Sequence, residues 1–341
     1  MPQPNDLSRS LVALDQNSTI IAVIEMKQSS WLVGGVLPGI ERQPRKKLEQ
    51  RGPSRPGLFD RVVNRISRPS LRIRRNDDRR VRSRSADGST SQMIIKEEFA
   101  DIATPTGPMR LHLFRPAAAG RYPGILLYSE IYQITGPIRR MAAFLAGQGY
   151  VVGAPEVYHE YEPLGTVLAY DVAGTDRGND LKFTKETSAF DSDARAGLDY
   201  LAGHARCTGR LGVMGICLGG HLAFRAALNP DVLAAACFYA TDIDTGTLGK
   251  GDDSLKRAGD IKGELLTVWG RQDPHVPLNG RNLIRARLEE VGANFQWHEV
   301  NGQHAFLRDE GPRYDPALAY HCYGLVFELF HRRLGSGDLA D

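Results

Sequence analysis

The sequence has few cysteines and no long apolar segment. Its 4 cysteines, among 341 residues, lie far apart and show no metal-ligand spacing. The apolar stretch at residues 19–24 ends at Glu25, and residues 31–40 contain Pro38, so neither stretch can span a bilayer. We therefore expect no metal centre and no membrane anchor, and the scattered thiols suit a reducing cytoplasm.

Negative charge is scarce in the first quarter of the chain. Residues 1–90 hold eighteen Lys and Arg against nine Asp and Glu, whereas the remainder holds 25 against 31. The run at residues 42–82 is dense in arginine, with scattered prolines and no helical or alternating period, which predicts disorder. We predict a basic extension over residues 1–92 and one catalytic domain over residues 93–341.

The extension allows two interpretations. A basic arm can bind nucleic acid or an anionic membrane through its positive charge. It can also be translated sequence upstream of a true start at Met93, which leaves a chain of ordinary size for one α/β domain. The second interpretation is the stronger, so we expect neither a nucleic-acid partner nor a membrane partner.

One short motif carries chemistry. Residues 215–220 read Gly-Ile-Cys-Leu-Gly-Gly, directly after the apolar run at 211–214 and before an apolar pattern at helical spacing. Glycine on both sides of an exposed apex residue lets a strand turn sharply into a helix, as at the nucleophile elbow of α/β-hydrolases. A lone cysteine is more often a small buried apolar residue, but this context identifies Cys217 as the nucleophile. The other three are expected to be structural, namely Cys207, Cys237 and Cys322.

An acid and a histidine follow in the chain order that this fold requires. Asp273 comes directly after one short apolar strand, and His304 comes after the next. Both therefore lie at carboxyl ends of strands, where the active sites of open α/β sheets collect. Asp273 alone, before a proline, is also typical of a turn, and His275 and His298 are rival imidazoles. Order and spacing together favour the triad of Cys217, Asp273 and His304.

Three local segments share a further pattern with one family. They are the cysteine elbow, the segment 302–308 reading Gly-Gln-His-Ala-Phe-Leu-Arg, and Ser-Glu-Ile-Tyr at 129–132 after an apolar strand. Together they resemble the dienelactone hydrolase family of α/β-hydrolases, and the resemblance runs from about Met93 to the C-terminus. Tyr132 and Gln133 depart from the Phe-Gly that often follows the Glu-Ile pair, which leaves the particular lactone open.

The resemblance implies roles for further residues. In that family the glutamate matching Glu130 hydrogen-bonds the resting thiol and helps to form the thiolate when substrate arrives. The backbone N–H groups matching Ile131 and Leu218 form the oxyanion hole, which a tetrahedral intermediate requires. The arginine matching Arg308 pairs with the substrate carboxylate, and its planar fork suits that task. Arg177 is the nearest candidate for the family's second substrate arginine.

Strands and helices alternate along the domain, which predicts an α/β-hydrolase fold with a mostly parallel central sheet flanked by helices on both faces. The segment from Tyr158 to Thr187 is long for a connection and is expected to roof the pocket. The predicted strands cover residues 109–115, 124–128, 150–153, 210–214, 233–239, 264–269 and 294–300, and the predicted helices cover 137–147, 188–204, 219–228, 278–291 and 315–333.

The sequence thus predicts a monomeric, cofactor-free hydrolase that opens a carboxylate-bearing lactone or ester. In a triad of this kind the imidazole favours the thiolate, and the carboxylate orients the ring and stabilises its protonated form. A broad carboxylesterase or thioesterase is the competing enzyme, and a catalytically silent ligand-binding protein is the alternative from another class. We expect no obligate protein partner.

Overall fold

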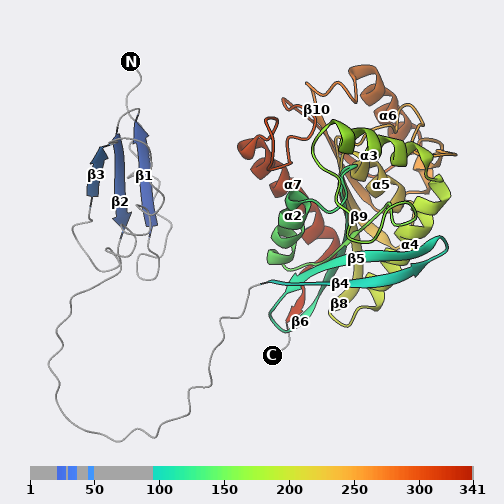
Figure 1. Cartoon of the computed structure of the whole chain (residues 1–341), viewed down its shortest axis with the longest axis horizontal. Coiled ribbons are helices and arrows are strands. Elements are labelled where there is room, and N and C mark those ends of the chain that lie inside the picture. The colour runs from blue at the N-terminus through green and yellow to red at the C-terminus, as the bar shows by residue number, and fades with distance from the viewer. Residues whose placement is uncertain (1–20, 28–29, 37–44, 50–94, 340–341) are drawn as a thin grey trace, which may run out of the picture. The chain divides into compact units, whose positions relative to one another are not determined.

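The computed structural model describes residues 21–27, 30–36, 45–49 and 95–339, which belong to two compact units (Figure 1). The first unit contains β1 (Ile21–Lys27), β2 (Ser30–Val36) and β3 (Arg45–Glu49), paired antiparallel in that order. The sequence predicted no regular structure in the extension, and these three strands differ from that prediction. The proposed start at Met93 lies outside the described residues.

The second unit is built on one twisted sheet. Its order is β11-β10-β9-β8-β6-β7-β5-β4, and β12 (Asp338–Leu339) pairs with β6. Strands β6 to β11 run parallel to one another, whereas β5 is antiparallel to both of its neighbours. This is the mostly parallel sheet predicted for an α/β-hydrolase fold. The strands are β4 (Ile95–Thr104), β5 (Gly107–Pro116), β6 (Gly120–Tyr128), β7 (Val151–Pro155), β8 (Cys207–Ile216), β9 (Val232–Phe238), β10 (Glu264–Gly270) and β11 (Phe295–Val300).

Helices cover both faces of this sheet and share two apolar cores with it. One apolar core lies under α2 (Gly136–Gly147) and α7 (Pro316–Leu334). The other lies under α3 (Val172–Thr184), α4 (Thr187–Gly203), α5 (Leu218–Ala226) and α6 (Leu278–Glu290). A short 3-10 helix, η2 (Lys256–Asp260), lies between β9 and β10. None of the helices in the described part of the chain has the length and hydropathy needed to cross a bilayer.

Helix α3 was not predicted. The structure places it inside the segment expected to be a long loop, so that segment is half helical. Its sequence has two glycines and no apolar period, but a side-chain cap fixes its start, because Asp171 accepts a hydrogen bond of 2.8 Å from the Gly174 N–H. Close packing holds its middle: a Cβ on Gly178 would lie 2.6 Å from the carbonyl oxygen of Ile131. Tertiary contacts therefore form a helix that local propensity does not indicate.

The parallel register brings four connections to one edge of the sheet. The carboxyl ends of parallel strands face the same way, so the residues that follow β6, β8, β10 and β11 gather there. These residues include Glu130, Cys217, Asp273 and His304.

Candidate active site

Cys217 lies at the turn between β8 and α5. Its backbone has φ 58° and ψ −122°, a conformation that L-residues rarely adopt. The turn is held by a hydrogen bond of 3.1 Å from the Cys217 N–H to the carbonyl oxygen of Phe238. The thiol is free and half-buried, whereas Cys207, Cys237 and Cys322 are free and buried. Position and exposure therefore separate Cys217 from the other thiols.

The glycines around Cys217 are required by close backbone approach. A Cβ on Gly215 would collide with the carbonyl oxygen of Gly219, and one on Gly219 would collide with that of Tyr128. A Cβ on Gly220 would lie 2.6 Å from the carbonyl oxygen of Phe238. These contacts involve backbone atoms, so the neighbours cannot rotate away.

We expect Gly215→Ala to destabilise the domain by about 1–3 kcal/mol, the usual cost of overpacking, because the new methyl group meets backbone. Gly324 is the matched control, since it lies exposed within α7 and a Cβ there meets nothing within 4 Å. Gly324→Ala should raise the free energy of unfolding by about 0.5–1 kcal/mol. Urea unfolding of both variants measures the difference, and equal effects would contradict the packing argument.

Asp273 and His304 form a hydrogen-bonded pair. His304 Nδ1 donates to Asp273 Oδ2 across 2.7 Å, and both side chains are buried. The other carboxylate oxygen accepts a hydrogen bond of 2.8 Å from the His275 backbone N–H. With Nδ1 occupied, Nε2 is the ring nitrogen left for Cys217, and the two side chains interact. The structure thus brings the three predicted residues together.

The charge on His304 is set by its partners. Burial alone would lower the pKa of His304, but the charge of Cys217 and the hydrogen bond to Asp273 outweigh it and raise the pKa to about 10. The ring of His275 lies 4.5 Å from that of His304, and burial lowers the pKa of His275. His298, the other rival, lies within β11 opposite Val268. Neither ring makes the carboxylate contact that His304 makes.

Glu130 is buried behind the turn after β6. Burial raises its pKa, and the charges of Arg308 and His304 oppose that rise. Ile131 follows it in a tight turn, and Leu218 is the first residue of α5. Within the described residues neither the Ile131 nor the Leu218 N–H donates to a backbone carbonyl. Both N–H groups therefore lack a backbone acceptor among these residues, and an oxyanion hole requires donors of this kind.

Arg308 lies beside Glu130 and is nearly buried, with 8% of its surface exposed. Its Nη1 is 3.7 Å from Glu130 Oε1, and its Nε donates to the carbonyl oxygen of Glu310. Its guanidinium also lies over the ring of Tyr170, 4.4 Å from the centroid. A planar cation therefore faces the site, partly compensated by one carboxylate.

Arg177 lies elsewhere on α3. Its side chain is 43% exposed, and its guanidinium donates to Glu162 at 2.7 Å and to Asp180 at 3.0 Å. These contacts do not include the triad or Glu130, so its role as a second substrate arginine remains a prediction.

Sequence reasoning missed three residues of this site. Tyr170 donates a hydrogen bond to Glu130, and Thr135 contacts the Tyr170 hydroxyl. Tyr239 packs edge-on against His304 with ring centroids 5.1 Å apart. Tyr239 directly follows β9, and that position could have indicated it. Tyr170 lies in an irregular segment without any local signal.

One group among the described residues has metal-ligand spacing. It consists of His159, Glu160 and Asp193. The ammonium of Lys185 lies 2.7 Å from Glu160 Oε1 and 2.6 Å from Asp193 Oδ2, and it is fully buried. A buried ammonium already pairs with both carboxylates, so the group is an ion-pair cluster.

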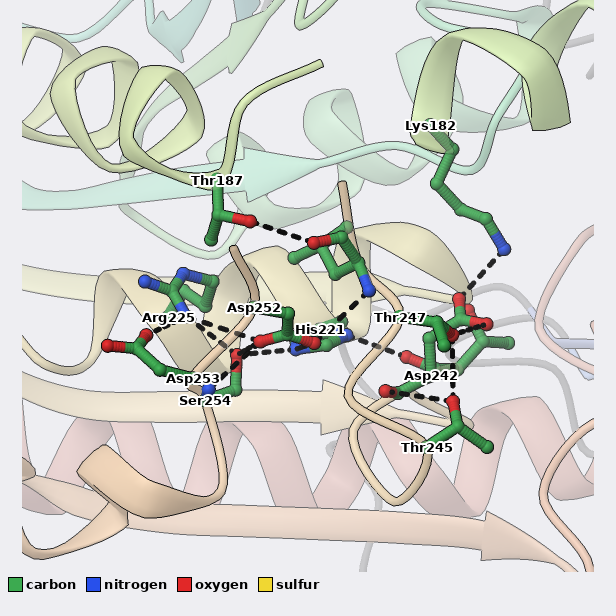
Figure 2. Close-up of polar contacts among 12 residues, drawn as sticks. Lys182, Thr187, His221, Arg225, Asp242, Thr245, Thr247, Asp252, Asp253 and Ser254 are labelled. Carbon is green, nitrogen blue, oxygen red and sulfur yellow. Dashed lines mark hydrogen bonds and ion pairs between the residues drawn. The ribbon is translucent and has the colours of Figure 1, made fainter. Parts of the chain in front are cut away.

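A polar network ties α5 to the segment after β9 (Figure 2). His221, one turn beyond Cys217, donates from Nδ1 to the carbonyl oxygen of Thr241 at 2.8 Å. Its Nε2 lies 2.7 Å from Ser254 Oγ, and Arg225 donates to the same hydroxyl at 2.8 Å. Burial lowers the pKa of His221 to about 4, so the ring is neutral at pH 7. His221 and Ser254 are both buried, so the network supports the turn rather than forming a second reaction centre.

This chain is similar to several known proteins in sequence and in fold. Residues 109–334 match the model of the dienelactone hydrolase family. A protein of Saccharomyces cerevisiae named "Putative carboxymethylenebutenolidase" is 44% identical over 266 residues, covering 73% of this chain and 97% of the relative. Carboxymethylenebutenolidase of Pseudomonas putida is 29% identical over 202 residues, covering 58% of this chain and 80% of that protein. The solved structure of a dienelactone hydrolase-like promiscuous phosphotriesterase from metagenomic libraries superposes with a TM-score of 0.58 at 18% identity, covering 71% of this chain and 99% of that one, and it shows the same fold.

Proposed function

Because this chain belongs to the dienelactone hydrolase family, we propose that it hydrolyses a lactone or carboxylic ester that bears a carboxylate. The observation that carries the proposal is the 2.7 Å hydrogen bond between His304 and Asp273, beside a half-buried cysteine at a strand-to-helix turn. The relatives named carboxymethylenebutenolidase support the choice of reaction. We further propose that residues 93–341 are the catalytic domain, and the four free cysteines support a reducing cytoplasm as its location.

The reaction begins with attack of the Cys217 thiolate on the ester carbonyl carbon. A C–S bond forms while the carbonyl electron pair moves to oxygen, and the N–H groups of Ile131 and Leu218 stabilise that oxyanion. Its collapse expels the alcohol oxygen, which takes a proton from His304 and leaves a thioester on Cys217. Neutral His304 then removes a proton from water, and attack of the hydroxide releases the acid and restores the thiolate.

Two carboxylates assist the reaction: Asp273 acts on His304, and Glu130 acts on Cys217. Asp273 fixes the tautomer of His304 and stabilises the ring when it is protonated. Burial raises the pKa of Glu130, which makes its carboxylate a better acceptor for the proton of a resting thiol. Glu130 is therefore proposed to help form the thiolate.

The proposed substrate class rests on Arg308. A nearly buried guanidinium is costly unless it is paired, and its contact to Glu130 is long at 3.7 Å. A substrate carboxylate can replace that contact with two parallel hydrogen bonds. The pocket should consequently prefer anionic esters over neutral ones.

Acid quenching during turnover tests the proposal. The protein is mixed with an activated ester, quenched with acid, and its intact mass is measured. The mass should increase by one acyl group, and peptide mapping should locate that group on Cys217. Iodoacetamide, which blocks a reactive thiol, should prevent acylation. Turnover with the acyl group on another residue would refute the thiol mechanism, and a protein with no turnover and no fast-reacting thiol would be a silent ligand-binding homologue.

Arg308→Ala should lower kcat/KM for a carboxylate-bearing ester by about tenfold to a hundredfold, because a charge-assisted hydrogen bond contributes about 1.5–3 kcal/mol. The loss should appear mainly as a higher KM. A neutral ester of the same size should be hydrolysed at an almost unchanged rate, since it never uses the contact. Steady-state kinetics on both esters gives the comparison.

Three further variants sharpen this test. Arg308→Lys should restore little, because an ammonium cannot form the planar fork. Arg285→Ala removes an exposed guanidinium on α6 and should change neither ester. Arg177→Ala tests the second predicted arginine in the same assay. Equal losses on both esters in Arg308→Ala would instead favour a broad carboxylesterase or thioesterase.

A further inference from the structure

Tyr170 is the residue through which Glu130 and Arg308 are connected. It lies just before the cap of α3 and is half-buried. Its hydroxyl donates to Glu130 Oε2 at 3.3 Å, and its ring lies under the Arg308 guanidinium at 4.4 Å. One side chain thus contacts both the proposed thiol-activating carboxylate and the proposed anion-binding cation.

Thr135 fixes the direction of this hydroxyl. Its Oγ1 lies 2.8 Å from the Tyr170 hydroxyl oxygen, and since Tyr170 gives its proton to Glu130, Thr135 must donate to Tyr170. Thr135 is the N-cap residue of α2, yet its side chain makes no capping hydrogen bond. A threonine at that position ordinarily stabilises the helix by capping its first turn. Here the Thr135 hydroxyl donates to the Tyr170 hydroxyl and does not cap the helix.

The ring of Tyr170 is fixed as well. It meets the ring of Tyr132 edge-on at 4.6 Å between centroids, and Tyr132 accepts a backbone hydrogen bond from Leu168 in the same segment. The hydroxyl of Tyr132 points to Thr175, at 2.8 Å, and not to Glu130. The two tyrosines therefore pack together but use their hydroxyls differently.

We propose that Tyr170 is a positioning and specificity residue that couples anion recognition by Arg308 to activation of Cys217 by Glu130. This inference rests on the proposed function of the same site. The hydroxyl, supported by Thr135, holds the Glu130 carboxylate in its charged form. The ring holds the guanidinium of Arg308 in the plane that a substrate carboxylate meets. The hydroxyl should therefore control the acidic limb of the pH profile, and the ring should control KM for an anionic ester.

The hydroxyl is tested by Tyr170→Phe. Loss of the donated hydrogen bond disfavours the Glu130 carboxylate, so the acidic limb of the pH profile should move upward by about one pH unit. KM for an anionic ester should stay within about twofold, because the ring remains. Thr135→Val should move the limb in the same direction by less, and the double variant should move it no further than Tyr170→Phe alone.

The ring is tested by Tyr170→Leu. Losing the cation–π contact should raise KM for the anionic ester by about threefold to thirtyfold and leave KM for a neutral ester unchanged. Tyr132→Phe is the matched control for Tyr170→Phe, because it removes a neighbouring hydroxyl that does not contact Glu130. An equal change in Tyr132→Phe and Tyr170→Phe would overturn the proposal, as would an unchanged acidic limb in Tyr170→Phe.

A second readout separates this inference from the proposed function. The rate of Cys217 alkylation by iodoacetamide, followed from pH 4 to pH 9, reports thiolate formation without any substrate. If alkylation shifts in Tyr170→Phe but no ester is turned over, the proposed reaction fails while the role of Tyr170 stands. If esters are hydrolysed but alkylation is the same in all variants, Tyr170 has no part in activation. Thermal unfolding of each variant verifies that the domain remains folded.

Discussion

Cys217→Ala is expected to lower kcat for ester hydrolysis by about ten-thousandfold or more, the usual result of removing a nucleophile that acts as one unit with its base. The domain should stay folded, because the change removes one sulfur atom from a half-buried position. Cys217→Ser should also be poor, since a hydroxyl forms its anion much less readily than a thiol. Steady-state kinetics and urea unfolding on the same samples measure the two properties.

Cys237→Ala makes the same chemical change in the neighbouring strand β9. Its thiol is buried, so this variant should lose some stability and keep its activity. Hydrolysis at near wild-type rate by Cys217→Ala, or a comparable loss of activity in Cys237→Ala, would show that the reaction does not use Cys217.

Asp273→Asn is expected to lower kcat by about a thousandfold to ten-thousandfold while KM changes little. Asn cannot stabilise the imidazolium of His304, and its amide group can hold the ring in the wrong tautomer. In the wild type the imidazolium is retained until the pH approaches about 10, the raised pKa of His304. Removing the carboxylate lowers that pKa, so the basic limb of the kcat/KM profile should move to lower pH.

A profile measured from pH 5 to pH 11 on both proteins gives this shift. Asp180→Asn, an exposed carboxylate that pairs with Arg177 on α3, should leave both the rate and the basic limb unchanged. A basic limb at the same pH in Asp273→Asn and wild type would mean that Asp273 does not raise the pKa of His304.

The sequence predicted the central fold and the places of the candidate site residues after the strands because both depend on local patterns. Alternating apolar strands and helices recur with turn signals between them, and the predicted α2, α5 and α6 end within two residues of the observed helices. The positions of Asp273 and His304 followed from the rule that reactive residues collect at carboxyl ends of parallel strands. In the structure the two side chains are joined by a hydrogen bond.

The residues that sequence reasoning missed depend on contacts between distant segments. Strand β4 is an exception with a local cause: most of its side chains are exposed, so its apolar alternation is weak, and it is held in a hairpin by pairing with β5. Helix α3 forms because its glycines fit against the turn at Ile131. Tyr170 is defined by Glu130, Thr135 and Arg308, and no short segment contains that set.

The placement of the candidate site residues after four separate strands has a consequence for folding kinetics. Glu130, Cys217, Asp273 and His304 follow β6, β8, β10 and β11, so no subset of neighbouring segments contains the whole site. Parallel pairing joins residues that are far apart in sequence, and such contacts form slowly because the chain must first close long loops. During refolding, helical circular dichroism should therefore recover before thiol reactivity, and hydrolysis should return last. Enzyme activity in this chain reports completion of the sheet.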